Sequence, residues 1–134
     1  MASDPTSTPE AAQAVVAELD ESAIAQIRNL QAGTNTDVLG KIVGLYEKSS
    51  ADLLDQMTAG LGGSDFEPIR VAAHTLKSSA ANVGASRLSE LCRELEQGDV
   101  GRDTSRLSGA VEAIREEHEA VLAALADELA KDAA

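Results

Sequence analysis

The sequence predicts an all-α fold, an antiparallel four-helix bundle with a short extra N-terminal helix. The chain has 134 residues, which is the size of one ordinary domain. Hydrophobic residues make up 43% of it but aromatic residues only 1%, so the core must consist of Leu, Ile, Val and Ala, a composition that favours helices over strands. Apolar residues also recur at helical spacing, in segments separated by short turns that contain Gly.

The N-terminal part is expected to contain a tail and one or two short helices. Residues 1–9 are rich in Ser, Thr and Pro and predict a flexible tail or linker, and residues 10–134 are assigned to the bundle domain. A short helix is expected to open at Thr8–Glu10. A second is expected to begin after Asp20 and to end at Gly33, with an apolar stripe of Ile24, Ile27 and Leu30.

The first two long helices follow. Asn35 or Thr36 is expected to cap a helix that ends near Gly60, with a stripe of Val38, Ile42, Leu45, Leu53, Leu54 and Met57. The spacing of Ser64 and Glu67 fits a capping box for a helix over about 65–83, in which Pro68 lies in the first turn.

The last two long helices are separated by further Gly-containing turns. Gly84 suits the left-handed position after a helix, and Ser86 is expected to cap a helix that runs to about Gln97. The final helix is expected from Asp103 or Thr104 towards Ala130, with a buried stripe of Leu107, Val111, Ile114, Val121, Leu125 and Leu129.

Charge and composition exclude several classes of function. The net charge of -12 disfavours binding to nucleic acids and to anionic membrane surfaces. A single cysteine, no secretory leader and no membrane-spanning run predict a cytoplasmic domain, tethered only if it belongs to a longer membrane protein. A monomer is expected, since no additional apolar heptad seam demands a partner.

His74 is the residue most able to carry chemistry. At about 100° per residue, the 65–83 helix directs Ile69, Ala72, Leu76, Ala80 and Val83 to one side, the expected core. His74 points the opposite way, with Arg70, Lys77, Ser78 and Ala81 nearby on the same face. An exposed neutral imidazole is a competent nucleophile towards phosphorus, and Lys77 could neutralise phosphoryl oxygens.

The segment around His74 also resembles a known family. The run AHTLKSSAANVGA over 73–85, followed by Leu88, Leu91, Cys92, Leu95 and Glu96, resembles the signature A-H-x-L-K-G-S-[AS]-x-x-[LVI]-G-[AL] then L-x-x-L-C-x-x-L-E of histidine-containing phosphotransfer (HPt) domains. The likeness is sharp over 73–96 and extends in architecture over about 21–129. Ser78 stands where many members have Gly.

This resemblance implies a function and a set of roles. His74 is then the phosphoacceptor, which takes a phosphoryl group from a receiver-domain aspartate and passes it to another receiver, and Lys77 assists by its charge. Arg70, Ser78, Ala81 and Gly84 are assigned to the surface that meets the partner, where Ser78 and Ala81 keep the surface low. The chain lacks ATP-binding motifs and is expected to be a phosphocarrier, not an enzyme, with no cofactor of its own and Mg²⁺ supplied by the receiver.

Charges are distributed in a way that fits this division of roles. Residues 70–106 carry six basic and five acidic side chains, whereas the rest of the chain carries five basic and eighteen acidic ones. A relatively basic surface near His74 would suit an acidic receiver pocket.

The other candidate residues are expected to be structural. His118 lies in a run of Glu residues and is expected at the surface, with no metal site. Cys92 shares a helical face with Leu88 and Leu95, which predicts a packing role.

Two alternative functions remain open from the sequence. The first is the phosphoacceptor domain of a chemotaxis-type kinase, which shares the bundle but receives its phosphoryl group from an ATP-binding kinase domain. The second is a non-catalytic helical interaction module in which His74 is incidental. A sensor-kinase dimerisation domain is disfavoured, because an acidic residue usually follows its phosphoacceptor and Thr75 follows here.

Overall fold

The computed structural model describes residues 15–34, 36–63, 65–98 and 103–133, and its regular secondary structure there is entirely helical. Both the predicted tail over 1–9 and the predicted helix at Thr8–Glu10 lie outside the described residues. The helices are α2 (Glu21–Ala32), α3 (Val38–Gly60), α4 (Glu67–Asn82), α5 (Ser86–Gln97) and α6 (Thr104–Ala133).

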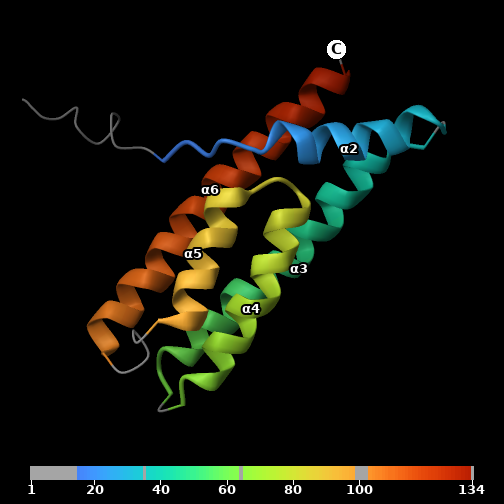
Figure 1. Ribbon diagram of the computed structural model, residues 1–134. Coiled ribbons are helices and arrows are strands. Elements are labelled where there is room, and N and C mark those ends of the chain that lie inside the picture. The colour runs from blue at the N-terminus through green and yellow to red at the C-terminus, as the bar shows by residue number, and fades with distance from the viewer. Residues whose placement is uncertain (1–14, 35, 64, 99–102, 134) are drawn as a thin grey trace, which may run out of the picture.

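Helices α3 to α6 form an antiparallel four-helix bundle, and α2 lies across one end of it (Figure 1). In that view α2 crosses from the C-terminal part of α6 to the N-terminal part of α3. The structure therefore confirms the predicted all-α bundle with a short additional helix before it.

Aspartate side chains satisfy the free amides at most helix starts. Asp20 Oδ1 accepts a hydrogen bond from the amide of Ser22 (3.0 Å), as predicted for the cap of α2. The cap of α3 is Asp37, whose Oδ1 accepts from the amide of Gly40 (2.9 Å), so the prediction of Thr36 was wrong by one residue. Asn35 and Ser64 lie outside the described residues.

A tight turn joins α4 to α5. Gly84 adopts the left-handed conformation (φ +80°), as predicted, and Ala85 donates from its amide to the carbonyl of Ala80 (2.8 Å). Ser86 is the first residue of α5 and makes no capping hydrogen bond, so its predicted role as the cap was wrong. Because the turn is so short, α4 and α5 must run side by side along their length.

The core contains the apolar faces of all five described helices. The predicted face of α4 is fully buried, with Ile69, Ala72, Leu76 and Ala80 at 0% exposure and Val83 at 1%. Two of these residues, Ala72 and Ala80, are small, so the neighbouring helices can approach α4 closely. At Gly60 in α3 this approach leaves no space for a side chain, since an added Cβ would lie 2.5 Å from Cγ1 of Ile69.

Two residues predicted for apolar stripes are exposed instead. Leu30 in α2 is 65% exposed and Leu45 in α3 is 70% exposed. At about 100° per residue, Leu30 lies some 120° from Ile24 around α2, and Leu45 lies equally far from Leu39 around α3. Both leucine side chains therefore lie outside the face of their helix that packs against the rest of the bundle.

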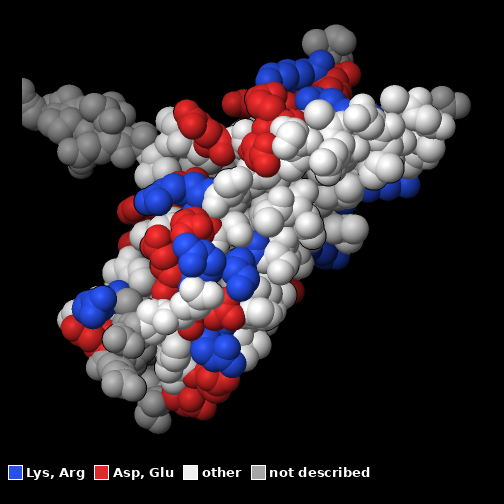
Figure 2. All heavy atoms as spheres, viewed as in Figure 1, with Lys and Arg blue, Asp and Glu red and all other residues white. Residues whose placement is uncertain are grey.

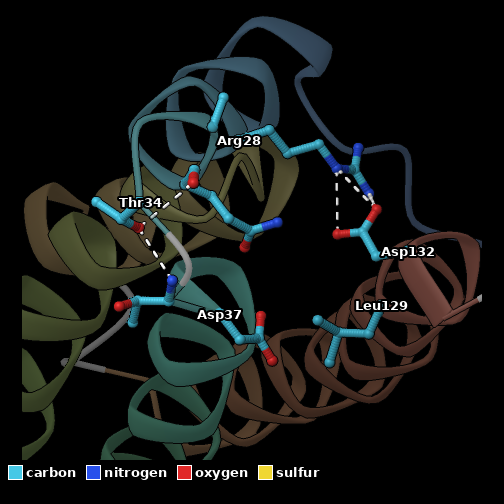
Figure 3. A pocket seen from close by; sticks show the side chains of 8 residues that line it. Arg28, Thr34, Asp37, Leu129 and Asp132 are labelled. Atoms are coloured by element: carbon cyan, nitrogen blue, oxygen red, sulfur yellow. Dashed lines mark hydrogen bonds and ion pairs between the residues drawn. The ribbon is translucent and has the colours of Figure 1, made fainter.

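Contacts at both of its ends hold α2 on the bundle. The amide of Asp20 donates to the carbonyl of Gly84 (2.7 Å), which fixes the start of α2 against the α4–α5 turn. Near the other end, Arg28 pairs with Glu128 Oε1 and with Asp132 Oδ1 on α6, each at 3.0 Å. Figure 3 shows Arg28 paired with Asp132 at one side of a pocket of about 610 Å³ between α2, α6 and the start of α3.

We predict that Gly84→Ala destabilises the fold by about 1–3 kcal/mol, because a non-glycine residue is strained at this positive φ. The added Cβ would also lie 3.0 Å from the carbonyl oxygen of Asp20. Urea unfolding of the variant measures the loss.

The matched control is Gly44→Ala in α3, where an added Cβ meets nothing within 4 Å. Because Ala is the better helix former, this variant should be more stable than the wild type by about 0.5–1 kcal/mol. An equal effect of the two substitutions would contradict the argument for Gly84.

Candidate functional site

The candidate site centres on His74, which α4 presents to solvent. Its side chain is 60% exposed, as the helical projection predicts. Nδ1 of the imidazole lies 2.5 Å from Oε2 of Glu96 on α5. The two residues are 22 positions apart in the chain, and the tight α4–α5 turn brings them together.

The same carboxylate also binds Lys77. Nζ of Lys77 donates to Oε1 of Glu96 at 2.7 Å, and the side chain of Glu96 is only 12% exposed. The hydrogen bond from Lys77 lowers the pKa of Glu96, with a smaller contribution from His74. Glu96 is therefore ionised at neutral pH and holds one partner on each oxygen.

This geometry determines how the imidazole can react. An ionised carboxylate only accepts hydrogen bonds, so the neutral imidazole places its proton on Nδ1 to donate to Glu96. Nε2 is then the unprotonated nitrogen with a free lone pair. The arrangement orients the ring from the side of α5 and leaves a nucleophile on an exposed face.

The predicted neighbours on α4 differ in their accessibility. Ser78 and Ala81 are exposed on the helix that carries His74. Arg70 is 38% exposed and is held by Glu67 through two hydrogen bonds, of 2.8 Å from Nε and 2.6 Å from Nη2.

Gly84 does not lie on an accessible surface. It is buried, and the start of α2 covers it at Asp20 and Ala23. The prediction that Gly84 contacts a partner was therefore wrong: its role is to form the turn between α4 and α5.

The remaining candidates do not form a second reactive centre. Cys92 is fully buried, and burial raises the pKa of its thiol to about 12, which confirms the packing role. His118 is only 3% exposed, so the prediction of a surface histidine was wrong. Among the described ranges, no cluster of three or more His, Cys, Asp or Glu side chains could hold a metal ion.

The pocket in Figure 3 is separate from the candidate site, because its lining includes none of His74, Lys77 and Glu96. The guanidinium of Arg28, which lines this pocket, is already paired with the carboxylates of Glu128 and Asp132. In the part of the chain that the structure describes, no helix combines the length and apolar character needed to cross a membrane.

Comparison with known proteins identifies the family. The sequence pattern of the Hpt domain matches residues 41–132, which is more than half of the chain. The chain belongs to the Hpt domain family. The matched range contains the whole His74–Lys77–Glu96 arrangement.

Curated relatives are similar to this chain over part of their length. The chain is 40% identical over 53 residues to sensor protein TorS of Escherichia coli, covering 40% of the chain and 6% of TorS. It is 28% identical over 74 residues to histidine-containing phosphotransfer protein 1 of Arabidopsis thaliana, covering 54% of the chain and 48% of that protein. The chain thus spans less than half the length of these relatives.

Solved structures have the same fold. Histidine-containing phosphotransfer protein B of Pseudomonas aeruginosa superposes with a TM-score of 0.68 at 25% identity, covering 82% of this chain and 92% of that one. A histidine-containing phosphotransfer protein from maize gives a TM-score of 0.67 at 22% identity, with coverages of 88% and 89%. The arrangement of the described helices is therefore that of the Hpt family.

Sequence reasoning missed the role of Glu96. The residue is part of the quoted family signature, but nothing in its helical phase alone indicates that it binds both His74 and Lys77. The available signal was an acidic residue at the edge of the apolar stripe of α5, next to Leu95.

We predict that Glu96→Gln weakens the preference of His74 for the tautomer with its proton on Nδ1, because the charged acceptor is lost. Long-range ¹H–¹⁵N NMR spectra report the tautomer through the two ring nitrogen shifts. Glu67→Gln is the matched control, since Glu67 pairs with Arg70 and should leave the ring of His74 unchanged. Identical tautomer populations in wild type and Glu96→Gln would exclude an orienting role for Glu96.

Proposed function

We propose that this protein is a phosphorelay intermediate that carries a phosphoryl group on Nε2 of His74 between receiver-domain aspartates. The observation that supports the proposal most directly is the exposed imidazole whose Nδ1 is bonded to Glu96. Membership of the Hpt family supports it independently.

The chemical step follows from the tautomer. The lone pair of Nε2 attacks the phosphorus of an aspartyl phosphate, an N–P bond forms, and the P–O bond to the aspartate breaks to release its carboxylate. Nδ1 keeps its proton and its hydrogen bond to Glu96, which stabilises the positive charge that develops on the ring. The reverse step returns the phosphoryl group to the aspartate of a second receiver.

Lys77 supplies a positive charge next to the reacting ring. Its ammonium group is held by the second oxygen of Glu96 and its side chain is 24% exposed, so it remains accessible to a phosphoryl group. In this proposal Lys77 attracts the phosphoryl oxygens while Glu96 keeps both groups in place.

The surface around α4 supports docking of a folded partner. Figure 2 shows charged side chains of both signs over α5 and the lower part of α4, beside a broad surface with few charges over α2, α3 and the upper part of α4. Exposed apolar side chains on these helices include Leu30, Leu45 and Val71. We propose that Arg70, Ser78 and Ala81 line the contact with the receiver.

The partner completes the reaction in this proposal. The receiver provides the acidic pocket and the Mg²⁺, and the protein itself needs neither a cofactor nor ATP. We place the reaction in the cytoplasm, whether the domain acts as a monomer or within a longer sensor protein.

We predict that His74→Gln abolishes phosphorylation without unfolding the protein, because the side chain is largely exposed and Gln cannot act as the nucleophile. Incubation with a panel of phosphorylated receiver domains measures acid-labile, base-stable phosphate on the protein. His118→Leu is the matched control, since His118 is buried and the sequence contains two histidines. That variant should keep its label.

The same assay separates the proposal from its alternatives. Label from an ATP-loaded kinase domain but from no receiver would favour the chemotaxis-type phosphoacceptor. Absence of label from either source, in a folded protein that binds receivers regardless of His74, would favour a non-catalytic interaction module. Retained label on His74→Gln would remove His74 as the acceptor.

We predict that Lys77→Ala slows phosphoryl transfer by about tenfold, less than the 10²–10³ typical of a buried oxyanion donor, because Lys77 is partly exposed to water. Rapid-quench measurement of transfer from one receiver gives the rate. Lys41→Ala, which removes an exposed lysine from α3, is the control and should transfer at the wild-type rate. An unchanged rate in Lys77→Ala would remove Lys77 from the site.

A further inference from the structure

The bundle contains a buried pair of polar rings that phosphoryl transfer does not use. His118 on α6 is 3% exposed, and Tyr46 on α3 is 4% exposed. Their ring centroids are 6.0 Å apart and their planes meet at 50°. The two rings therefore form part of the contact between α3 and α6, and both are enclosed by the core.

Both rings have a polar atom without a partner. Nδ1 of His118 and the hydroxyl oxygen of Tyr46 are buried and make no hydrogen bond in the structure. A buried polar atom without a partner costs free energy, and a buried charge without a partner costs far more. The contact between α3 and α6 can therefore hold a neutral imidazole. A protonated imidazole carries a second N–H group, and no acceptor is present at Nδ1 to bind it.

The surroundings of His118 do not compensate for a charge. From α3 the ring that faces His118 is that of Tyr46, whose pKa burial raises. Cys92 on α5 acts on Tyr46, and burial keeps its thiol protonated. On α6 itself, exposed Arg115 opposes protonation and exposed Glu119 favours it. Burial outweighs both and lowers the pKa of His118 below its ordinary value of 6.5.

We propose that His118 makes the contact between α6 and α3 sensitive to acid. While its imidazole is neutral this contact stabilises the bundle, and protonation of the imidazole weakens the contact. The proposal does not depend on phosphoryl transfer, because His118 lies in the core and His74 lies at the surface. It predicts that the folded domain loses stability in mild acid.

The pH range follows from the direction of the shift. Since the folded pKa lies below 6.5, the unfolded chain binds the proton first, and stability is lost as the pH falls from about 6.5 towards the folded pKa. Carboxylates with lowered pKa, such as Glu96 and Glu128, lose their contribution only below their ordinary value of 4.5. Buried Glu117, whose pKa is raised by burial, acts in the opposite sense and gains protons on folding.

The test compares urea unfolding of the wild type and His118→Leu at pH values from 7.5 to about 5. One proton taken up on unfolding changes the unfolding equilibrium constant by up to tenfold per pH unit. This extra dependence should be present in the wild type and absent in His118→Leu. The difference between the two profiles cancels the contribution of Glu117, which both proteins retain.

Tyr46→Phe is the second variant, because it removes the unpartnered hydroxyl but keeps His118. It should unfold with the pH dependence of the wild type. Titration of the carbon-bound ring protons of His118 by NMR gives a measurement on the unmodified protein, in which His118 should titrate below 6.5. Parallel stability profiles for wild type and His118→Leu, or titration of His118 at or above 6.5, would overturn the proposal.

Discussion

The turn between α4 and α5 determines which side chains of these two helices face each other. The turn has only three residues, 83–85, which is too short to allow α4 and α5 to shift along each other. The two helices therefore run antiparallel in a single register. Gly84 makes this possible by adopting a positive φ that other residues avoid. Because the register is determined, Glu96 reaches both His74 and Lys77, and the proposed site depends on this turn more than on any single side chain within it.

The docking of α2 depends on the same turn. The amide of Asp20 donates to the carbonyl of Gly84, and the Arg28 pairs with α6 hold the other part of the helix. The turn therefore has a backbone partner on its outer side as well as the core on its inner side. This double constraint explains why Gly84, although it belongs to the family signature, is buried and cannot meet a partner directly.

The two histidines of the chain illustrate how burial separates chemical roles. His74 lies at the surface with a carboxylate that orients it, so its outer nitrogen is available to a reacting group. His118 lies in the core beside Tyr46 with an unpartnered nitrogen, so it contributes to packing while neutral. The same side chain serves a proposed reaction in one place and determines the pH response of the fold in the other.

The sequence by itself determined the helices, most of the core and the exposed position of His74, because helical periodicity and the residues at helix ends are local properties. Every residue that it assigned to the buried face of α4 is buried, although it did not include the equally buried Ala73. It also placed Lys77 beside His74, because the two are separated by less than one turn. Only the tertiary structure decided the rest. The pairing of Glu96 with His74, the burial of His118 and Gly84, and the exposure of Leu30 and Leu45 depend on how helices pack against one another, and the periodicity of one helix does not contain that information.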